Sequence, residues 1–288
     1  MGNHKTEKLQ PGLYFVATPI GSARDITLRA LDILASADVI AAEDTRSMKR
    51  LLEIHGVSLG DRPVLSYHDH SGEKTRAKLV AHIAAGRSVA YASEAGTPLI
   101  ADPGYHLSRA VAEAGHLVTS APGPSAIITA LTLAGLPTDA FFFAGFLPNA
   151  RTARRKAMQA VAAVPGTLVF YESPKRVGAM LADAVEVFGP ERRGAVAREL
   201  TKKFEEVRRG SLTDLVSSIQ EAPPKGEIVV LIERAPTKEA SPEEIEAALS
   251  EALKTLSVRD ASAEVAETFG GHKRNIYQIA LQLKKDQE

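Results

Sequence analysis

The sequence contains no cysteine and no tryptophan, and its formal net charge is zero. Without cysteine, disulfides, thiolate nucleophiles, iron–sulfur clusters and thiolate zinc sites are excluded. The balance of 35 basic and 35 acidic residues excludes a uniformly basic nucleic-acid-binding protein, but it permits local basic patches. The absence of tryptophan argues against a base-stacking platform for single-stranded nucleic acid. These absences indicate a protein whose chemistry does not involve thiols.

Long apolar runs are also absent, since no run approaches the roughly 18 residues needed to cross a bilayer. Residues 1–12 are mostly polar and lack the apolar segment of a signal peptide, so we interpret them as a disordered lead-in. A cytoplasmic protein without a membrane partner is the expected class.

The order of apolar and polar segments predicts an α/β protein with two α/β domains and a small helical domain. Short apolar runs alternate with helical patterns from residue 13 to residue 233, which is typical of mostly parallel sheets. The composition changes to basic and polar after Pro148, where we place the first domain boundary. The predicted organisation is an N-terminal domain over 13–148, a second domain over 149–234, and a linker with a helical domain over 235–288.

The last segment has the features of a short helix bundle. Ser241-Pro242-Glu243-Glu244 is a typical helix start, and Gly270-Gly271 separates two further helical patterns. Two short helices around a glycine turn are similar to a helix-turn-helix, which is a weak signal alone.

Several common functional motifs are absent or incomplete. Gly72-Glu73-Lys74-Thr75 lacks the frame of a phosphate-binding P-loop, and the turn after the first strand lacks the Rossmann glycines. Gly123-Pro124-Ser125-Ala126-Ile127 misses the second glycine of a serine-hydrolase elbow. His68-Asp69-His70 has no third ligand nearby in the sequence, so we interpret it as a polar turn and predict no metal site.

Two strand-to-loop turns are the most informative feature. Residues 93–100, Ser-Glu-Ala-Gly-Thr-Pro-Leu-Ile, follow one apolar strand, and residues 122–126, Pro-Gly-Pro-Ser-Ala, follow the next. Glycine lets the main chain approach a ligand closely because it has no Cβ. Either turn alone is an ordinary loop, whereas the pair at one sheet edge predicts a slot for a small ligand.

Six motifs occur in an order that resembles the tetrapyrrole methylase-like family of S-adenosylmethionine enzymes. They are residues 18–21 (TPIG), 42–46 (AEDTR), 93–100 (SEAGTPLI), 102–105 (DPGY), 122–126 (PGPSA) and 170–173 (FYES). The resemblance runs from about Leu13 to Glu233 and is stronger to the RNA-modifying branch of the family. One departure is Glu94, where the family usually has an aspartate.

The resemblance implies a cofactor cleft between two α/β domains, S-adenosylmethionine as cofactor, and a homodimer. It also implies methylation of a cytidine ribose 2′-hydroxyl in the decoding region of small-subunit (16S) ribosomal RNA, free or in the assembled small ribosomal subunit. The cofactor-binding residues that it implies are Pro19, Gly96, Thr97, Pro98, Ile100, Ser125, Ala126, Leu147, Glu172, Leu200 and Gly226.

A ribose hydroxyl is a poor nucleophile, so a base near it would help. The candidates are acids at strand ends, namely Asp44, Glu43 and Glu172, and we favour Asp44 with Arg46 as an orienting group. The competing interpretation is that Asp44 caps the following helix.

Basic clusters beside the cleft are the candidate RNA contacts. They are Arg151, Arg154, Arg155 and Lys156 after the boundary, and Lys273 and Arg274 in the helical domain. Two other functions stay open, namely a tetrapyrrole or other small-molecule methylase of the same fold, and a non-catalytic ribosome-assembly module.

Overall fold

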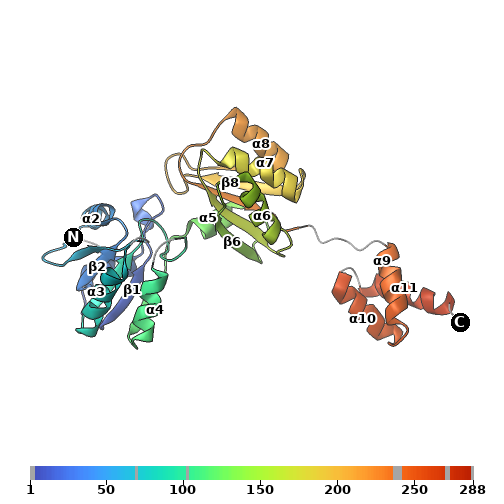
Figure 1. Cartoon of the computed structure of the whole chain (residues 1–288), viewed down its shortest axis with the longest axis horizontal. Helices are drawn as coiled ribbons and strands as arrows, with labels where there is room; N and C mark the ends of the chain where they lie inside the picture. Colours follow the sequence, from blue (N-terminus) through green and yellow to red (C-terminus); the bar gives the residue numbers. More distant parts are fainter. Residues whose placement is uncertain (1–3, 69–70, 102–103, 236–241, 270–272, 287–288) are drawn as a thin grey trace. The chain divides into compact units, whose positions relative to one another are not determined.

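The computed structural model describes residues 4–68, 71–101, 104–235, 242–269 and 273–286. Contacts divide the chain into two compact units, Met1–Arg234 and Ala235–Glu288. The first unit contains two five-stranded sheets, and the second is helical (Figure 1). Within the described residues, no helix is both long and apolar enough to span a membrane.

The first sheet is entirely parallel, with strand order β3-β2-β4-β1-β5. Its strands are β1 (Gly12–Val16), β2 (Val39–Ala42), β3 (Val64–Ser66), β4 (Ser88–Ala92) and β5 (Leu117–Ala121). The three inner strands, β2, β4 and β1, are buried along their whole length, as expected of a parallel sheet with helices on both faces. The predicted parallel α/β arrangement is confirmed for this sheet.

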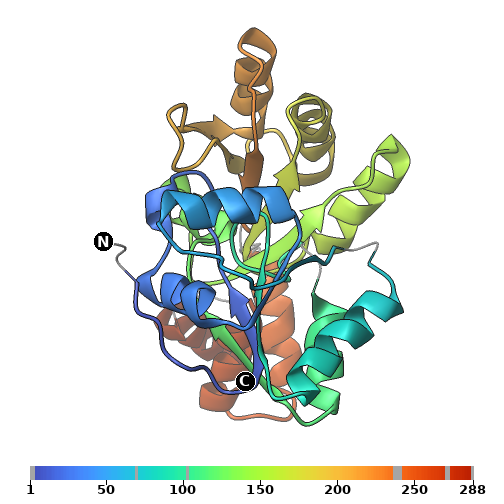
Figure 2. The ribbon, with the colours of Figure 1, turned by 90° about the vertical axis from the view of Figure 1, so that its left-hand side faces the viewer.

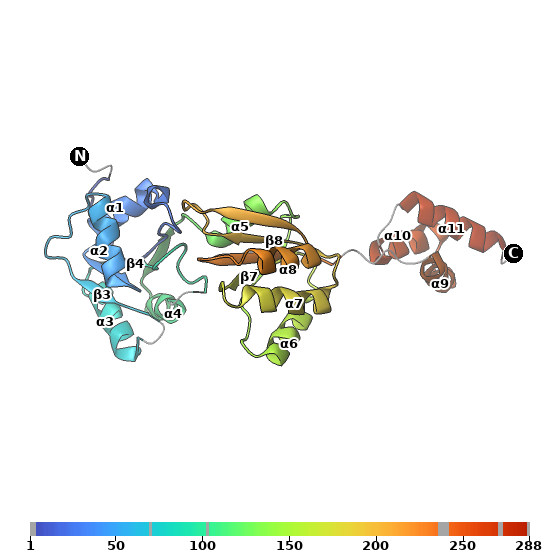
Figure 3. The ribbon, with the colours of Figure 1, turned by 90° about the horizontal axis from the view of Figure 1, so that it is seen from above.

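Helices cover both faces of the first sheet (Figure 3). Tyr14 and Val16 of β1 pack toward α1 (Leu28–Ser36) and α2 (Thr45–Ile54), which follow the short 3-10 helix η1 (Ala23–Asp25) and β2. The alternate residues Leu13 and Phe15 pack toward α3 (Glu73–Ala84) and α4 (Tyr105–Glu113). Because successive strand side chains point to opposite faces, one apolar strand supports two cores.

The second sheet is mixed, with strand order β6-β7-β10-β8-β9. Its strands are β6 (Phe141–Phe146), β7 (Thr167–Glu172), β8 (Arg193–Arg198), β9 (Glu206–Ser211) and β10 (Ile228–Ile232). Only the pair of β6 and β7 is parallel. One face packs against α6 (Arg151–Val161), α7 (Val177–Phe188) and α8 (Leu212–Glu221), and the other against α5 (Ala126–Ala134).

The placement of β6 and α5 differs from the sequence prediction. The sequence assigns both segments to the first domain, which it ends at residue 148. In the structure, β6 pairs with β7, and Ile127 and Leu131 of α5 pack on the second sheet. Apolar periodicity identifies a strand or a helix but does not show which sheet it joins. We therefore propose that the boundary lies between β5 and α5.

The basic segment after Pro148 forms helix α6. The segment beyond Glu199 contributes β9, which pairs antiparallel with β8.

The helical unit has a core of its own. It consists of α9 (Pro242–Ala252), α10 (Val258–Phe269) and α11 (Lys273–Asp286). Leu249, Val265 and Ile276, one from each helix, are buried together. The predicted helix start at Pro242 and the helix around 257–269 agree with α9 and α10. Ser241 and the Gly270-Gly271 turn lie outside the described residues.

Candidate functional site

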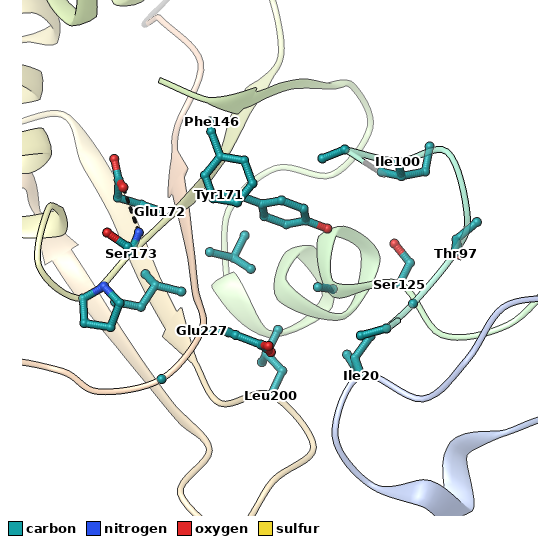
Figure 4. A pocket seen from close by; sticks show the side chains of 18 residues that line it. Ile20, Thr97, Ile100, Ser125, Phe146, Tyr171, Glu172, Ser173, Leu200 and Glu227 are labelled. Carbon is teal, nitrogen blue, oxygen red and sulfur yellow. Dashed lines mark hydrogen bonds between the residues drawn. The ribbon is translucent and has the colours of Figure 1, made fainter. Parts of the chain in front are cut away.

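A cavity of about 380 Å³ lies where turns from the first sheet meet turns from the second sheet. Figure 4 shows Ile20, Thr97 and Ser125 on one side of it, facing Tyr171, Glu172 and Leu200 on the other. The complete lining is Ile20, Ala95, Gly96, Thr97, Ile100, Ala101, Ser125, Ala126, Phe146, Tyr171, Glu172, Ser173, Pro174, Leu200, Gly226, Glu227, Ile228 and Val229. The carboxyl ends of parallel strands supply the first wall, which is where ligands bind in open α/β sheets.

The turn after β4 is fixed by main-chain hydrogen bonds. The N–H of Thr18 donates to the carbonyl of Gly96 at 2.9 Å, and the N–H of Gly96 donates back at 3.0 Å. Thr97 Oγ1 donates to the carbonyl of Pro124 at 2.9 Å, so the two glycine–proline turns are joined directly. The sequence predicted that these turns would meet at one edge, and the structure brings them together.

Left-handed backbone gives this turn its shape. Gly96 has a φ of 79°, and a Cβ there would approach Ile20 Cγ2 to 3.3 Å. Leu99 and Ala101 also have positive φ angles, of 70° and 59°, on either side of Ile100. Positive φ is costly for residues with a side chain and gathers at ligand-binding sites. Ile100, which lies between these two residues, is exposed at the cavity wall.

The turn after β8 forms the opposite wall in a similar way. Glu199 and Thr201 have positive φ angles, of 48° and 63°, and the buried Leu200 between them lines the cavity. The carboxylate of Glu199 accepts hydrogen bonds from Lys202 Nζ at 2.9 Å and from the N–H of Glu227 at 3.1 Å. The Lys202 hydrogen bond is the main cause that lowers the pKa of Glu199.

Gly226 is required by this network. It has a φ of 87°, and a Cβ at this position would overlap the Glu199 carboxylate. Only glycine therefore allows Glu199 to reach Lys202 and the main chain of Glu227.

The first-strand turn docks against the same loop. A Cβ on Gly21 would lie 2.6 Å from Thr201 Oγ1, and the N–H of Ser22 donates to that oxygen at 3.0 Å. The glycine of the Thr18-Pro19-Ile20-Gly21 motif thus serves contact between the two walls. Ile20 is the residue of this motif that lines the cavity, whereas Pro19 does not.

Glu172 is buried and fixed at the end of β7. Its Oε1 accepts from the N–H of Ser173 at 2.7 Å and lies 3.2 Å from Arg176 Nε. Its Oε2 has no hydrogen-bond partner within the described residues. Arg176 also donates to the carbonyl of Leu147, whose side chain is in the core of the second sheet.

Eight of the predicted cofactor-binding residues line the cavity: Gly96, Thr97, Ile100, Ser125, Ala126, Glu172, Leu200 and Gly226. Pro19, Pro98 and Leu147 do not. Phe146, Tyr171 and Glu227 also line the cavity and were not predicted from the sequence. Tyr171 and Phe146 had a detectable signal, since each is an aromatic residue at a strand end beside a predicted site residue.

Asp44 lies outside the cavity and caps α2. Its Oδ1 accepts from the N–H groups of Arg46 and Ser47 at 2.7 and 3.0 Å, and its Oδ2 lies 3.4 Å from Arg46 Nη2. These hydrogen bonds, first that from Ser47, lower the pKa of Asp44. A lowered pKa makes a carboxylate a weaker base. The capping interpretation therefore describes Asp44 better than the predicted role as general base.

Two substitutions separate these roles. Asn is as good a cap as Asp, so Asp44→Asn is expected to keep both the unfolding midpoint and methyl transfer near wild type. Asp44→Ala is expected to lower the midpoint in a thermal melt while methyl transfer persists. Loss of turnover in Asp44→Asn, with cofactor binding intact, would instead reinstate Asp44 as the base.

The basic cluster of α6 is largely paired with acids of α7. Arg154 is buried and reaches Asp183 at 2.6 Å, while Arg151 reaches Asp183 at 3.0 Å and Glu186 at 2.6 Å. Arg155 reaches Glu186 at 2.5 Å. The burial of Arg154 argues against its predicted RNA contact, because its guanidinium is enclosed by the fold. Lys156 is exposed, and its RNA contact stays a prediction.

Two predicted groups remain, namely the basic pair of the helical unit and the possible metal cluster. Lys273 and Arg274 are exposed at the start of α11, as an RNA contact would require. Asp69 and His70 of the possible metal cluster lie outside the described residues, and no group of three metal-ligating side chains occurs within the described ones.

Comparison with known proteins now gives the family. Residues 12–216 match the model of the Tetrapyrrole (Corrin/Porphyrin) Methylases, and residues 239–284 match that of the RsmI C-terminal HTH domain. The chain is 46% identical to ribosomal RNA small subunit methyltransferase I of Mesorhizobium japonicum, over 96% of this chain and 93% of that protein. It belongs to this methyltransferase family. The Escherichia coli O157:H7 relative of the same name is 41% identical over 98% and 99% of the two chains.

Solved structures show the same fold at lower identity. The methyltransferase CobJ has a TM-score of 0.56 at 21% identity and covers 80% of this chain and 97% of its own. Uroporphyrin-III C-methyl transferase from Thermus thermophilus, complexed with S-adenyl homocysteine, has a TM-score of 0.54 at 18% identity and covers 76% and 96%. These matches confirm the tetrapyrrole methylase fold, and membership of the methyltransferase family supports the predicted S-adenosylmethionine cofactor.

Proposed function

We propose that this chain transfers the methyl group of S-adenosylmethionine to a cytidine ribose 2′-hydroxyl in the decoding region of small-subunit ribosomal RNA, in the cytoplasm and as a homodimer. The observation that carries the proposal is the match along nearly the whole chain, helical unit included, to relatives named for small-subunit ribosomal RNA. The structures of uroporphyrin-III C-methyltransferase cover only 76–78% of this chain. The additional helical unit therefore favours RNA over a tetrapyrrole as substrate.

The cavity suits the proposed cofactor in size and in chemistry. About 380 Å³ is within the range of sites that enclose a small ligand. Leu200, Ile228 and Val229 offer an apolar surface for a flat adenine ring. Gly96 and Gly226 line the cavity with main chain alone.

The start of α5 suits the carboxylate of the methionine part. Ser125 is the N-cap of α5, its side chain makes no capping hydrogen bond, and both Ser125 and Ala126 line the cavity. The first N–H groups of a helix lack partners within it and favour a negative charge. We therefore assign the carboxylate to this end of the cavity and the adenine to the turns of the second sheet.

The bound cofactor supplies an electrophilic methyl group on a sulfonium. The contribution of the chain is to hold the ribose hydroxyl in line with that methyl group at about 3 Å, which converts a bimolecular encounter into a positioned reaction. The turns that define the cavity are braced by Thr97, Glu199 and Thr201, so their geometry is set before the substrate arrives.

The test uses small ribosomal subunits from a strain that lacks this enzyme, incubated with methyl-labelled S-adenosylmethionine. Label is expected in the ribosomal RNA, on a ribose of the decoding region. Cofactor binding without labelled RNA would favour the assembly-module interpretation. Label on an added tetrapyrrole, but not on RNA, would favour the small-molecule methylase.

A further inference from the structure

Helix α2 carries a basic groove that lies outside the cofactor cavity. We propose that this groove binds the phosphodiester backbone of the substrate RNA and leads it to the cavity. The proposal rests on the proposed function, since it requires an RNA substrate. It moves the main RNA contact of the first unit from α6 to α2.

The groove has a basic rim and an apolar floor. It is an open depression of about 630 Å³ between α2 and the loop that follows this helix. Its polar lining is Arg46, Lys49, Arg50 and Glu53, and the spacing of three and four residues places the three cations on one face of the helix. Leu52 and Val57 are buried below them. In Figure 2, α2 is the light-blue helix across the centre of the view, with no other helix in front of it.

These cations are available to a ligand, unlike the buried Arg154 of α6. The side chain of Arg46 is 93% exposed, and its contact with Asp44 is long, at 3.4 Å. Lys49 is exposed and has no ion pair within the described residues. Arg50 is 68% exposed and pairs with Glu53 across one helical turn, a surface ion pair that is worth little. By contrast, Arg154 is buried against Asp183.

The groove begins beside the cofactor cavity. Arg46 is in the first turn of α2, which Asp44 caps at the carboxyl end of β2. The neighbouring Glu43 accepts a hydrogen bond from the N–H of Glu94 at 3.3 Å, and the next residue, Ala95, lines the cavity. An RNA chain whose phosphates contact Arg46 and Lys49 is therefore held at the edge of the first sheet where its ribose must enter the cavity.

The experiment compares an Arg46→Ala/Lys49→Ala variant with the wild type in binding to under-methylated small ribosomal subunits at several salt concentrations. Two lost phosphate contacts on single-stranded RNA reduce the slope of log affinity against log salt by about 1.4. This change in slope corresponds to roughly 25-fold weaker binding of the variant at 0.1 M salt. Cofactor affinity and the thermal unfolding midpoint are expected to stay at the wild-type values.

The matched control is Lys74→Ala/Lys78→Ala on α3, which removes two exposed charges from the opposite face of the same sheet. It is expected to bind subunits as the wild type does. Wild-type affinity and salt slope in the α2 variant would overturn the proposal, while RNA labelling by the wild type would still support the proposed function. Weaker binding to intact subunits, with unchanged binding to protein-free ribosomal RNA, would assign the groove to a ribosomal protein and also overturn it.

Discussion

Replacing Arg154 with methionine is expected to destabilise the Met1–Arg234 unit by about 3 kcal/mol, because the change leaves the buried carboxylate of Asp183 without its main partner. The side chains of Arg154 and Asp183 are 7% and 3% exposed. Arg151 still contacts Asp183, so the effect should fall at the low end of the range for a broken buried pair. Denaturant unfolding followed by circular dichroism measures the loss.

The control for this experiment is Arg155→Met, which removes a partly exposed partner of Glu186 and should cost less than about 1 kcal/mol. The double variant Arg154→Met/Asp183→Leu removes both charges and should recover much of the stability. Equal stability of Arg154→Met and the wild type, together with weaker RNA binding, would show that Arg154 serves RNA rather than the fold.

Changing Gly226 to alanine is expected to weaken binding of S-adenosylmethionine about tenfold or more. A φ of 87° is unfavourable for alanine, and the new Cβ overlaps the Glu199 carboxylate, so it breaks the hydrogen bonds that brace the loop holding Leu200 against the cavity. A backbone forced into an unfavourable conformation costs about 1–3 kcal/mol, and each 1.4 kcal/mol lost from binding is a factor of ten. Titration calorimetry with S-adenosylmethionine measures the change.

Gly189 offers a matched control for Gly226. It also has a positive φ, of 95°, but a Cβ there would meet nothing within 4 Å, and the residue follows α7 away from the cavity. Gly189→Ala should reduce stability without changing cofactor affinity. If both alanine variants lowered cofactor affinity equally, general backbone strain rather than the Glu199 network would explain the effect.

The helices and strands could largely be predicted from the sequence, whereas the sheet that each of them joins could not. The inner strands of the first sheet are short apolar runs between turn residues, so their length and composition identify them. The same signal marks Phe141–Phe146, yet this strand belongs to the second sheet. Sheet membership depends on the path of α5 across the molecule, and periodicity carries no information about that path.

The candidate site could also be predicted only in part from the sequence. Gly96 and Ser125 are visible in the sequence because glycine, proline and hydroxyl residues interrupt apolar strands. The basic residues near Arg154 looked like one surface, but Asp183 lies far along the chain and becomes their partner only when α6 packs against α7. The charge of a segment shows its potential to bind RNA, and only folding shows which charges are already neutralised.

The path of α5 has a consequence for how the molecule folds. This helix follows the edge strand of the first sheet, yet it packs on the second, and Ile20 from the first-strand turn enters the same core. A chain cut between α5 and β6 would leave the first fragment with an apolar helix that has no sheet to cover. We therefore expect residues 12–234 to unfold in one cooperative transition, which titration with cofactor should shift as a whole.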